Sequence, residues 1–320
     1  MLVRMAALPS PELSGLVTEW RVQPVAIAGL AVLGFEYVRS LQRVRARGVR
    51  WPAHRSLVFA IGIALAVWAS CGFFEAYGSS LYWSWTAQAL LLLLVVPLVL
   101  LTGHPVELAR LARGGPTVVD RALASRTGRF FGNPLVGPAL VPLLSAVLFF
   151  GPLPRWAIDT PAIGWILDVL LVLVGALIVL PLVDLDARPS SLAVGLVLAI
   201  GSFELVLDAI PGIALRLRTS LATSWFDARD VHSWSIHPLR DQQIAGATLW
   251  VVAELIDLPF LLLVYRRWLR ADARDAAEAD AVLDAERAAR AALRGGAEPD
   301  TDEPWWLTDP AMRDRMRRQR

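Results

Sequence analysis

YWSWTAQALLLLLVVPLVLLTGHPVEL, residues 82–108, is an apolar run that stops at Gly103, His104 and Pro105. About 20 apolar residues in a helix cross the hydrocarbon core of a bilayer, which is roughly 30 Å thick. The whole chain of 320 residues is 56% hydrophobic and has a mean hydropathy of +0.51, whereas soluble domains are usually about 45–50% apolar. The sequence therefore predicts an all-α, polytopic membrane protein.

Seven apolar runs are long enough to span a bilayer as helices. They lie at 23–41, 56–74, 83–102, 134–153, 163–183, 191–214 and 242–264. Pro138, Pro142 and Pro152 interrupt the fourth run, which is tolerated where neighbouring helices satisfy the freed carbonyls. We predict a bundle of about seven transmembrane helices over residues 23–265.

The arginines predict the orientation of this bundle. Six arginines lie in 39–55 and five between the third and fourth runs, and Arg266, Arg267 and Arg270 follow the last run. Since positively charged loops stay in the cytoplasm, we expect residues 1–22 to be extracytoplasmic and the C-terminus to be cytoplasmic. The pattern of residues 1–22 leads us to expect no cleaved signal peptide. The expected location is the bacterial plasma membrane, with the lipid bilayer as a partner.

The chain changes character after residue 265. Residues 266–296 are rich in alanine, arginine and carboxylates and end at Gly295–Gly296, which predicts a charged cytoplasmic helix. This helix is either solvated or docks a partner. Residues 297–320, with an arginine-rich end, are predicted to be disordered or associated with a surface.

Several ionisable residues fall inside or beside the predicted spans, where an unpaired charge is costly. Glu75 lies just beyond the second run, close enough to reach lipid head groups. Glu204 and Asp208 share one face of the sixth run, and Glu254 and Asp257 share one face of the seventh. These four carboxylates form either a structural polar network or a pathway for protons or a small solute.

The sequence offers few ligands for a soft metal. Copper(I) prefers thiolate, thioether or imidazole ligands, but all four methionines lie outside the predicted spans and the chain has one cysteine, Cys71. His232 and His237, together with Asp168, are the only weak candidates for a metal site. We therefore predict no cofactor, and copper is disfavoured.

Other function classes have even less support in the sequence. No phosphate-binding glycine loop, GxSxG or HExxH pattern is present, so we predict no enzyme. The net charge of +2 implies no nucleic-acid partner.

Three stretches, at 76–110, 241–259 and 266–280 (RRWLRADARDAAEAD), resemble the CtaG family of cytochrome c oxidase assembly proteins. Residues 76–110 resemble its third span, with Tyr77–Gly78, Gln88 and the Gly103–Pro105 turn in matching places. Residues 241–259, DQQIAGATLWVVAELIDLP, resemble its DQQxxGxxxW stretch, which carries Asp241, Gln242 and Gln243. The resemblance implies an outer polar cluster of Gln88, Asp241, Gln242 and Gln243.

The chain departs from that family at its histidines. The two histidines of the family's third-span pattern fall on Trp85 and Ala89, and a second pair falls near Gly164 and Asp168. Indole and methyl side chains cannot replace imidazole as metal ligands. The resemblance thus implies a membrane factor in cytochrome oxidase biogenesis that binds oxidase subunits or other assembly factors and does not carry copper. The alternatives are the carboxylate pathway and a metal site rebuilt from His232, His237 and Asp168.

Overall fold

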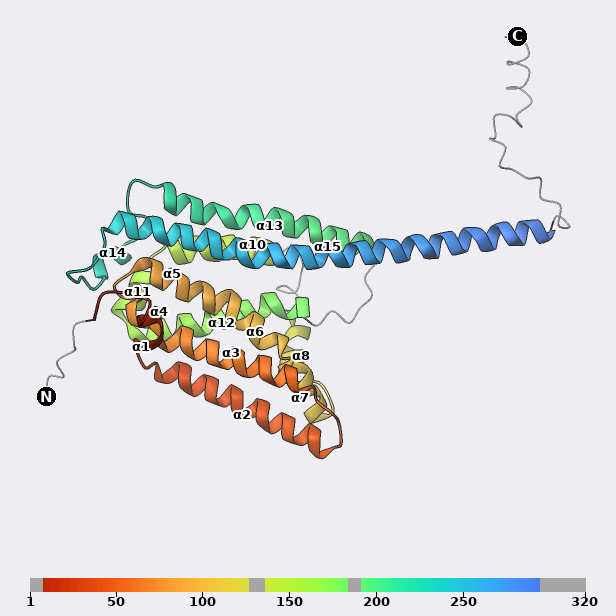
Figure 1. Ribbon diagram of the computed structural model, residues 1–320, viewed down its shortest axis with the longest axis horizontal. Helices are drawn as coiled ribbons and strands as arrows, with labels where there is room; N and C mark the ends of the chain where they lie inside the picture. The colour runs from red at the N-terminus through yellow and green to blue at the C-terminus, as the bar shows by residue number, and fades with distance from the viewer. Residues whose placement is uncertain (1–7, 127–135, 184–190, 294–320) are drawn as a thin grey trace, which may run out of the picture. The chain divides into compact units, whose positions relative to one another are not determined.

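The computed structural model describes residues 8–126, 136–183 and 191–293, and their regular elements are all helices (Figure 1). This confirms the predicted all-α class for the described residues. The chain divides into two compact units, one of residues 1–188 and 195–265 and the other of residues 189–194 and 266–320. The predicted tail, residues 297–320, lies outside the described residues.

Long helices make up most of the first unit. They are α2 (Pro24–Ala46), α3 (Ala53–Cys71), α5 (Tyr82–Leu90) with the π-helical turn η1 (Leu91–Val95) and α6 (Val96–Thr102), α10 (Val136–Phe150), α12 (Pro161–Val183), most of α13 (Ser191–Leu217) and the first half of α15 (Pro238–Leu293). Short helices connect them: α1 (Gly15–Thr18), α4 (Phe73–Tyr77), α7 (Pro105–Arg113), α8 (Val118–Ala124), α11 (Leu153–Asp159) and α14 (Trp225–Ala228).

Four stretches of described helix are long and apolar enough to cross a membrane. They are Pro24–Ala46, Ala53–Tyr77, Tyr82–Thr102 and Pro161–Leu180. They correspond to the predicted spans 23–41, 56–74, 83–102 and 163–183. The other three predicted spans fall on α10, α13 and α15; their membrane crossing, and the orientation of the bundle, stay predictions.

The third span changes its helical pitch at a proline. Pro97 has no N–H to donate to the carbonyl of Leu93, four residues earlier, and the turn Leu91–Val95 is π-helical. Helix α12 packs against η1 and α6 at this point. Gly175 of α12 allows the approach, because a Cβ there would lie 1.8 Å from the Leu93 carbonyl oxygen.

Gly175→Ala is expected to destabilise this contact, because backbone atoms and not a movable side chain occupy the space. Overpacking of this kind costs about 1–3 kcal/mol. Thermal unfolding of the purified protein in detergent measures the effect. Gly29→Ala is the matched control, since a Cβ at Gly29 of α2 meets nothing within 4 Å. Equal melting temperatures of the two variants contradict the expectation.

Aromatic side chains fill the core beside the start of α5. Tyr82 and Trp225 are fully buried, and the Tyr82 hydroxyl donates to the carbonyl of Phe149 at 2.9 Å. The Tyr82 ring stacks on that of Trp85 with centroids 5.8 Å apart. This cluster fixes the first turn of α5, which carries the residues of the candidate site.

Candidate functional site

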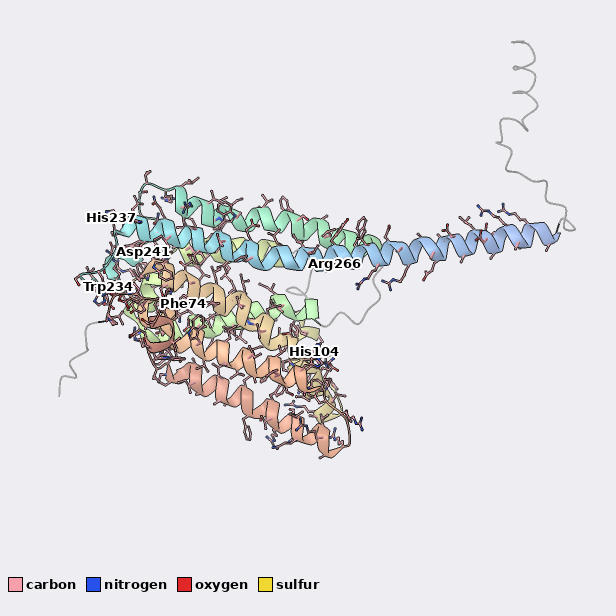
Figure 2. All side chains as sticks on the ribbon, viewed as in Figure 1. Phe74, His104, Trp234, His237, Asp241 and Arg266 are labelled. Carbon is pink, nitrogen blue, oxygen red and sulfur yellow. The ribbon has the colours of Figure 1, made fainter. Side chains whose placement is uncertain are left out.

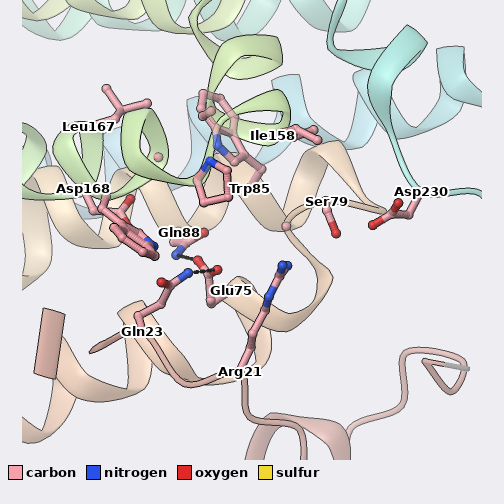
Figure 3. Close-up of a pocket in the computed structure, with 15 residues that line it drawn as sticks. Arg21, Gln23, Glu75, Ser79, Trp85, Gln88, Ile158, Leu167, Asp168 and Asp230 are labelled. Carbon is pink, nitrogen blue, oxygen red and sulfur yellow. Dashed lines mark hydrogen bonds between the residues drawn. The ribbon is translucent and has the colours of Figure 1, made fainter. Parts of the chain in front are cut away.

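A cavity of about 220 Å³ opens at one end of the first unit, where α2, α4, α5, α11 and α12 meet (Figure 3). Its polar or charged lining residues are Arg21, Gln23, Glu75, Ser79, Gln88, Asp168 and Asp230, and its indoles are Trp85 and Trp165. The Arg21 backbone N–H donates to the Cys71 carbonyl at 2.7 Å, which holds the segment before α2 against the end of α3.

Glu75 is the centre of the hydrogen bonding in this cavity. The Gln88 side-chain amide donates to Glu75 Oε2 at 2.8 Å, and the Gln23 amide donates to Glu75 Oε1 (Figure 3). Gln88 and Gln23 are only 4% and 9% exposed. Two buried amides, one from the residue before α2 and one from α5, are therefore satisfied by one carboxylate.

Two glycines give Glu75 and Gln88 their positions. At Gly72 the backbone is extended (φ −89°, ψ −151°), so α3 ends and α4 begins in a new direction with Glu75 in its first turn. A Cβ on Gly78 would lie 2.9 Å from the Phe74 carbonyl oxygen and 3.3 Å from Gln88 Oε1. Because Gly78 has no Cβ, the Gln88 amide can lie against the backbone there.

The positions that resemble the CtaG histidine sites converge on this cavity. Trp85, Gly164 and Asp168 all line it. Ala89, the fourth such position, is 4% exposed and packs in the hydrophobic core beside it. The Asp168 carboxylate accepts no hydrogen bond within the part of the chain that the structure describes.

Asp241 has a different role from Gln88, although the resemblance grouped them in one polar cluster. Asp241 is fully buried, and its two carboxylate oxygens accept from the backbone N–H groups of Tyr82 at 2.9 Å and Trp83 at 3.0 Å. It therefore caps the first turn of α5 from another helix, where a carboxylate also complements the helix dipole. Burial raises the pKa of Asp241, and the two backbone hydrogen bonds oppose this rise.

Gln242 closes the connection between α13 and α14. Its side-chain oxygen accepts from the Ala222 N–H at 2.7 Å, and its amide donates to the carbonyls of Ser220 at 3.1 Å and Leu215 at 3.4 Å. Gln243 is half-buried. Asp241 and Gln242 support the end of the bundle, and neither lines the cavity.

The structure does not gather the candidate metal ligands around Asp168. His232 Nε2 lies 3.1 Å from the Ser80 hydroxyl and its ring stacks on Trp234 at 4.7 Å, while the exposed His237 accepts from the Leu239 N–H at 3.3 Å. Figure 2 places Trp234, His237 and Asp241 at the same end of the unit as Phe74, far from His104. Among the described residues, no group of three or more histidine, cysteine, aspartate or glutamate side chains is placed to hold a metal ion.

The predicted carboxylate pathway is described only at Glu254. Glu254 is half-buried and accepts a local hydrogen bond from the Trp250 indole at 3.2 Å. The side chains of Glu204, Asp208 and Asp257 lie outside the described residues, so the pathway stays a prediction.

Sequence reasoning missed the two residues that organise the cavity. It placed Glu75 among the lipid head groups, whereas both carboxylate oxygens are bound by buried amides. Gln23 was not singled out at all, because it precedes its helix and belongs to no motif. The available signal was Gln88: a lone amide within an apolar run needs a polar partner.

The lining of the cavity suits particular ligands. Carboxylates, amides and a guanidinium bind ammonium, phosphate or hydroxyl groups, and indoles stabilise cations. Among the described residues, no cysteine, methionine or histidine lines the cavity, and these are the side chains that copper(I) prefers.

Comparison with known proteins gives the family. A model described as cytochrome c oxidase caa3 assembly factor matches residues 35–271. Uncharacterised proteins of Mycobacterium bovis and Mycobacterium tuberculosis are each 26% identical over 87% of this chain and 43% of their own length. One from Mycobacterium leprae is 27% identical over 84% of this chain and 42% of its own. The chain thus spans less than half the length of these relatives, and no solved structure matches it. Because the family model covers most of the sequence, the chain belongs to the cytochrome c oxidase caa3 assembly factor family.

Proposed function

We propose that this chain is a non-enzymatic, multi-pass plasma-membrane factor in cytochrome c oxidase biogenesis. It acts by binding oxidase subunits or another assembly factor and not by carrying copper. The family match supports the process in which it takes part. The chemistry of the cavity supports the mode of action.

The supporting observation lies at the positions that resemble histidine sites in the CtaG family. In this chain they present Trp85, Gly164 and Asp168 to a cavity whose central group is Glu75, bound by two glutamine amides. Oxygen and amide groups of this kind bind copper(I) poorly. The same groups hold the ends of α2, α4 and α5 together, which suits a surface that presents one fixed shape to a partner protein.

Deletion of the gene, with growth in media with and without added copper, tests this proposal. We expect the deletion to lower assembled cytochrome oxidase, measured from its haem absorbance and copper content, and we expect added copper not to restore it. Recovery with copper indicates metal delivery and contradicts the proposal. Normal oxidase in both media removes the assembly role altogether.

A second measurement addresses the partner directly. The tagged full chain, extracted in mild detergent, is expected to retain oxidase subunits or another assembly factor above the level retained by an unrelated multi-pass protein of equal abundance. If the deletion strain loses oxidase but the tagged chain retains no such partner, the role in oxidase biogenesis is supported and the binding mechanism is contradicted.

A further inference from the structure

An apolar groove lies next to the polar cavity and shares one residue with it. The groove has a volume of about 310 Å³ and is lined by Val25, Ala162, Trp165, Ile166, Val169 and Leu170. Trp165 also lines the polar cavity. The polar cavity and the apolar groove therefore both border the Trp165 side chain.

The groove follows one face of α12. Ile166 follows Ala162 by four residues, and Val169 and Leu170 follow Ile166 by three and four, so these side chains share a face of the helix. From Ala162 to Leu170 the helix rises about 12 Å. Ile166 and Leu170 are 60% and 49% exposed in a helix that is apolar enough to span a bilayer. An acyl chain is the apolar group that a membrane supplies to such a surface.

The cavity beyond Trp165 carries charges of both signs. Glu75 and Asp168 are its carboxylates within spanning helices, and Arg21 lies on the opposite side of Glu75 from Asp168 (Figure 3). Among the described residues, neither the Asp168 carboxylate nor the Arg21 guanidinium has an ion-pair or side-chain hydrogen-bond partner. A ligand head group with a cation at one end and an anion at the other complements both.

We propose that the cavity and groove together bind a phospholipid whose head group ends in a primary ammonium. The ammonium lies between Glu75 and Asp168 and beside the indoles, the phosphate faces Arg21, and one acyl chain lies along α12. A primary ammonium donates three hydrogen bonds, which a quaternary one cannot, and Asp168 is the acceptor left without a donor. A purely anionic head group meets three carboxylates, those of Glu75, Asp168 and Asp230, and is disfavoured.

The position of the site within the membrane agrees with this ligand. Glu75 lies near the end of one spanning helix, Gln23 just before the start of another, and Asp168 in the first half of Pro161–Leu180. The polar cavity is therefore near one membrane surface. On α12 the cavity is lined between Pro161 and Asp168 and the groove between Ala162 and Leu170, so the groove begins beside the cavity and extends two residues further along the helix. A lipid whose acyl chain lies beside α12 fits this arrangement.

The test uses the full chain extracted with its surrounding lipid and then delipidated into phosphatidylcholine nanodiscs. Native mass spectrometry measures retention of added phosphatidylethanolamine and phosphatidylglycerol. We expect retention of phosphatidylethanolamine above its share of the bulk lipid, no such retention of phosphatidylglycerol, and about tenfold weaker binding for Asp168→Asn, since it removes a charge-assisted hydrogen bond. Arg21→Gln is expected to weaken binding in the same direction.

The groove has its own variant and control. Val169→Trp places an indole in the groove, whereas Val32→Trp places the same indole at an exposed position of α2 outside the groove. Only Val169→Trp is expected to displace the lipid. Melting temperatures establish whether each variant is folded. If a variant does not fold, lipid retention by the unaltered chain still tests the proposal.

Several results overturn the proposal. Bound lipid in bulk proportions, or equal retention of phosphatidylglycerol, removes the ammonium assignment. If Val169→Trp leaves lipid retention unchanged and soluble phosphoethanolamine competes with the lipid equally well in that variant and in the unaltered chain, the site recognises a free solute and not a membrane lipid. Loss of oxidase assembly has no part in these measurements, so they remain separate from the proposed function.

Discussion

Asp241→Ala is expected to lower the free energy of unfolding by about 3 kcal/mol, since it leaves two buried backbone N–H groups without an acceptor. These are the amides of Tyr82 and Trp83, which now donate to the Asp241 carboxylate at 2.9 and 3.0 Å. Leu81, the residue before α5, provides no side-chain cap. Thermal unfolding followed by tryptophan fluorescence measures the effect, because indoles surround this turn.

The chain provides a matched control two residues away. Gln243→Ala changes a half-buried residue of the same DQQ stretch, and we expect a change within about 0.5 kcal/mol, as at most partly exposed positions. If Asp241→Ala and Gln243→Ala lower the free energy of unfolding equally, the two hydrogen bonds that Asp241 accepts do not explain its effect, and the capping role of Asp241 is contradicted.

The pH dependence of Asp241 has a definite sign. Burial raises its pKa in the folded protein, so the folded state holds this proton at a pH where the unfolded chain, with a carboxyl pKa of about 4, has released it. The wild-type protein should lose stability as the pH rises from about 4 through the raised pKa. Asp241→Asn should remove this loss of stability between about pH 4 and the raised pKa. If stability depends on pH in the same way in the variant and the wild type, this prediction is contradicted.

Four of the seven predicted spans are confirmed as long apolar helices, and they were predictable because their signal is local and strong. A run such as residues 82–102 has few polar side chains, and bilayer thickness fixes the length that a spanning helix needs. The charged helix after residue 265 was predictable for a similar reason, since no glycine or proline occurs in 266–293 and α15 continues unbroken to Leu293. Neither inference required knowledge of which helices pack together.

The cavity was predictable only in part. The third-span resemblance singled out Gln88 and Trp85, and the loose match near residue 164 singled out Asp168, and all three line the cavity. Gln23 and Glu75 could not be joined to them, because a hydrogen bond over 52 positions in the sequence depends on helix packing. The DQQ stretch was recognised as a motif, but its role as a cap for α5 follows from tertiary structure alone.

Glu75→Ala is expected to have the second large effect, on stability and on oxidase assembly together. It removes the acceptor of two amides that are buried in the core, Gln23 and Gln88. Leaving two such donors unsatisfied costs about 3 kcal/mol. In the deletion strain, this variant should then restore less assembled cytochrome oxidase than the wild-type gene, measured by haem absorbance at equal protein level.

Glu75→Gln separates the shape of the site from its charge. The side chain keeps its size, but an NH2 group now faces one of the two donating amides, so one hydrogen bond is lost and the other remains. Glu36→Gln is the control, because Glu36 is a half-exposed glutamate in another spanning helix, with a local partner in Arg39. If Glu75→Gln matches Glu36→Gln in melting temperature and in oxidase level, the carboxylate of Glu75 organises neither the cavity nor the function, and the cavity is only a gap between helices.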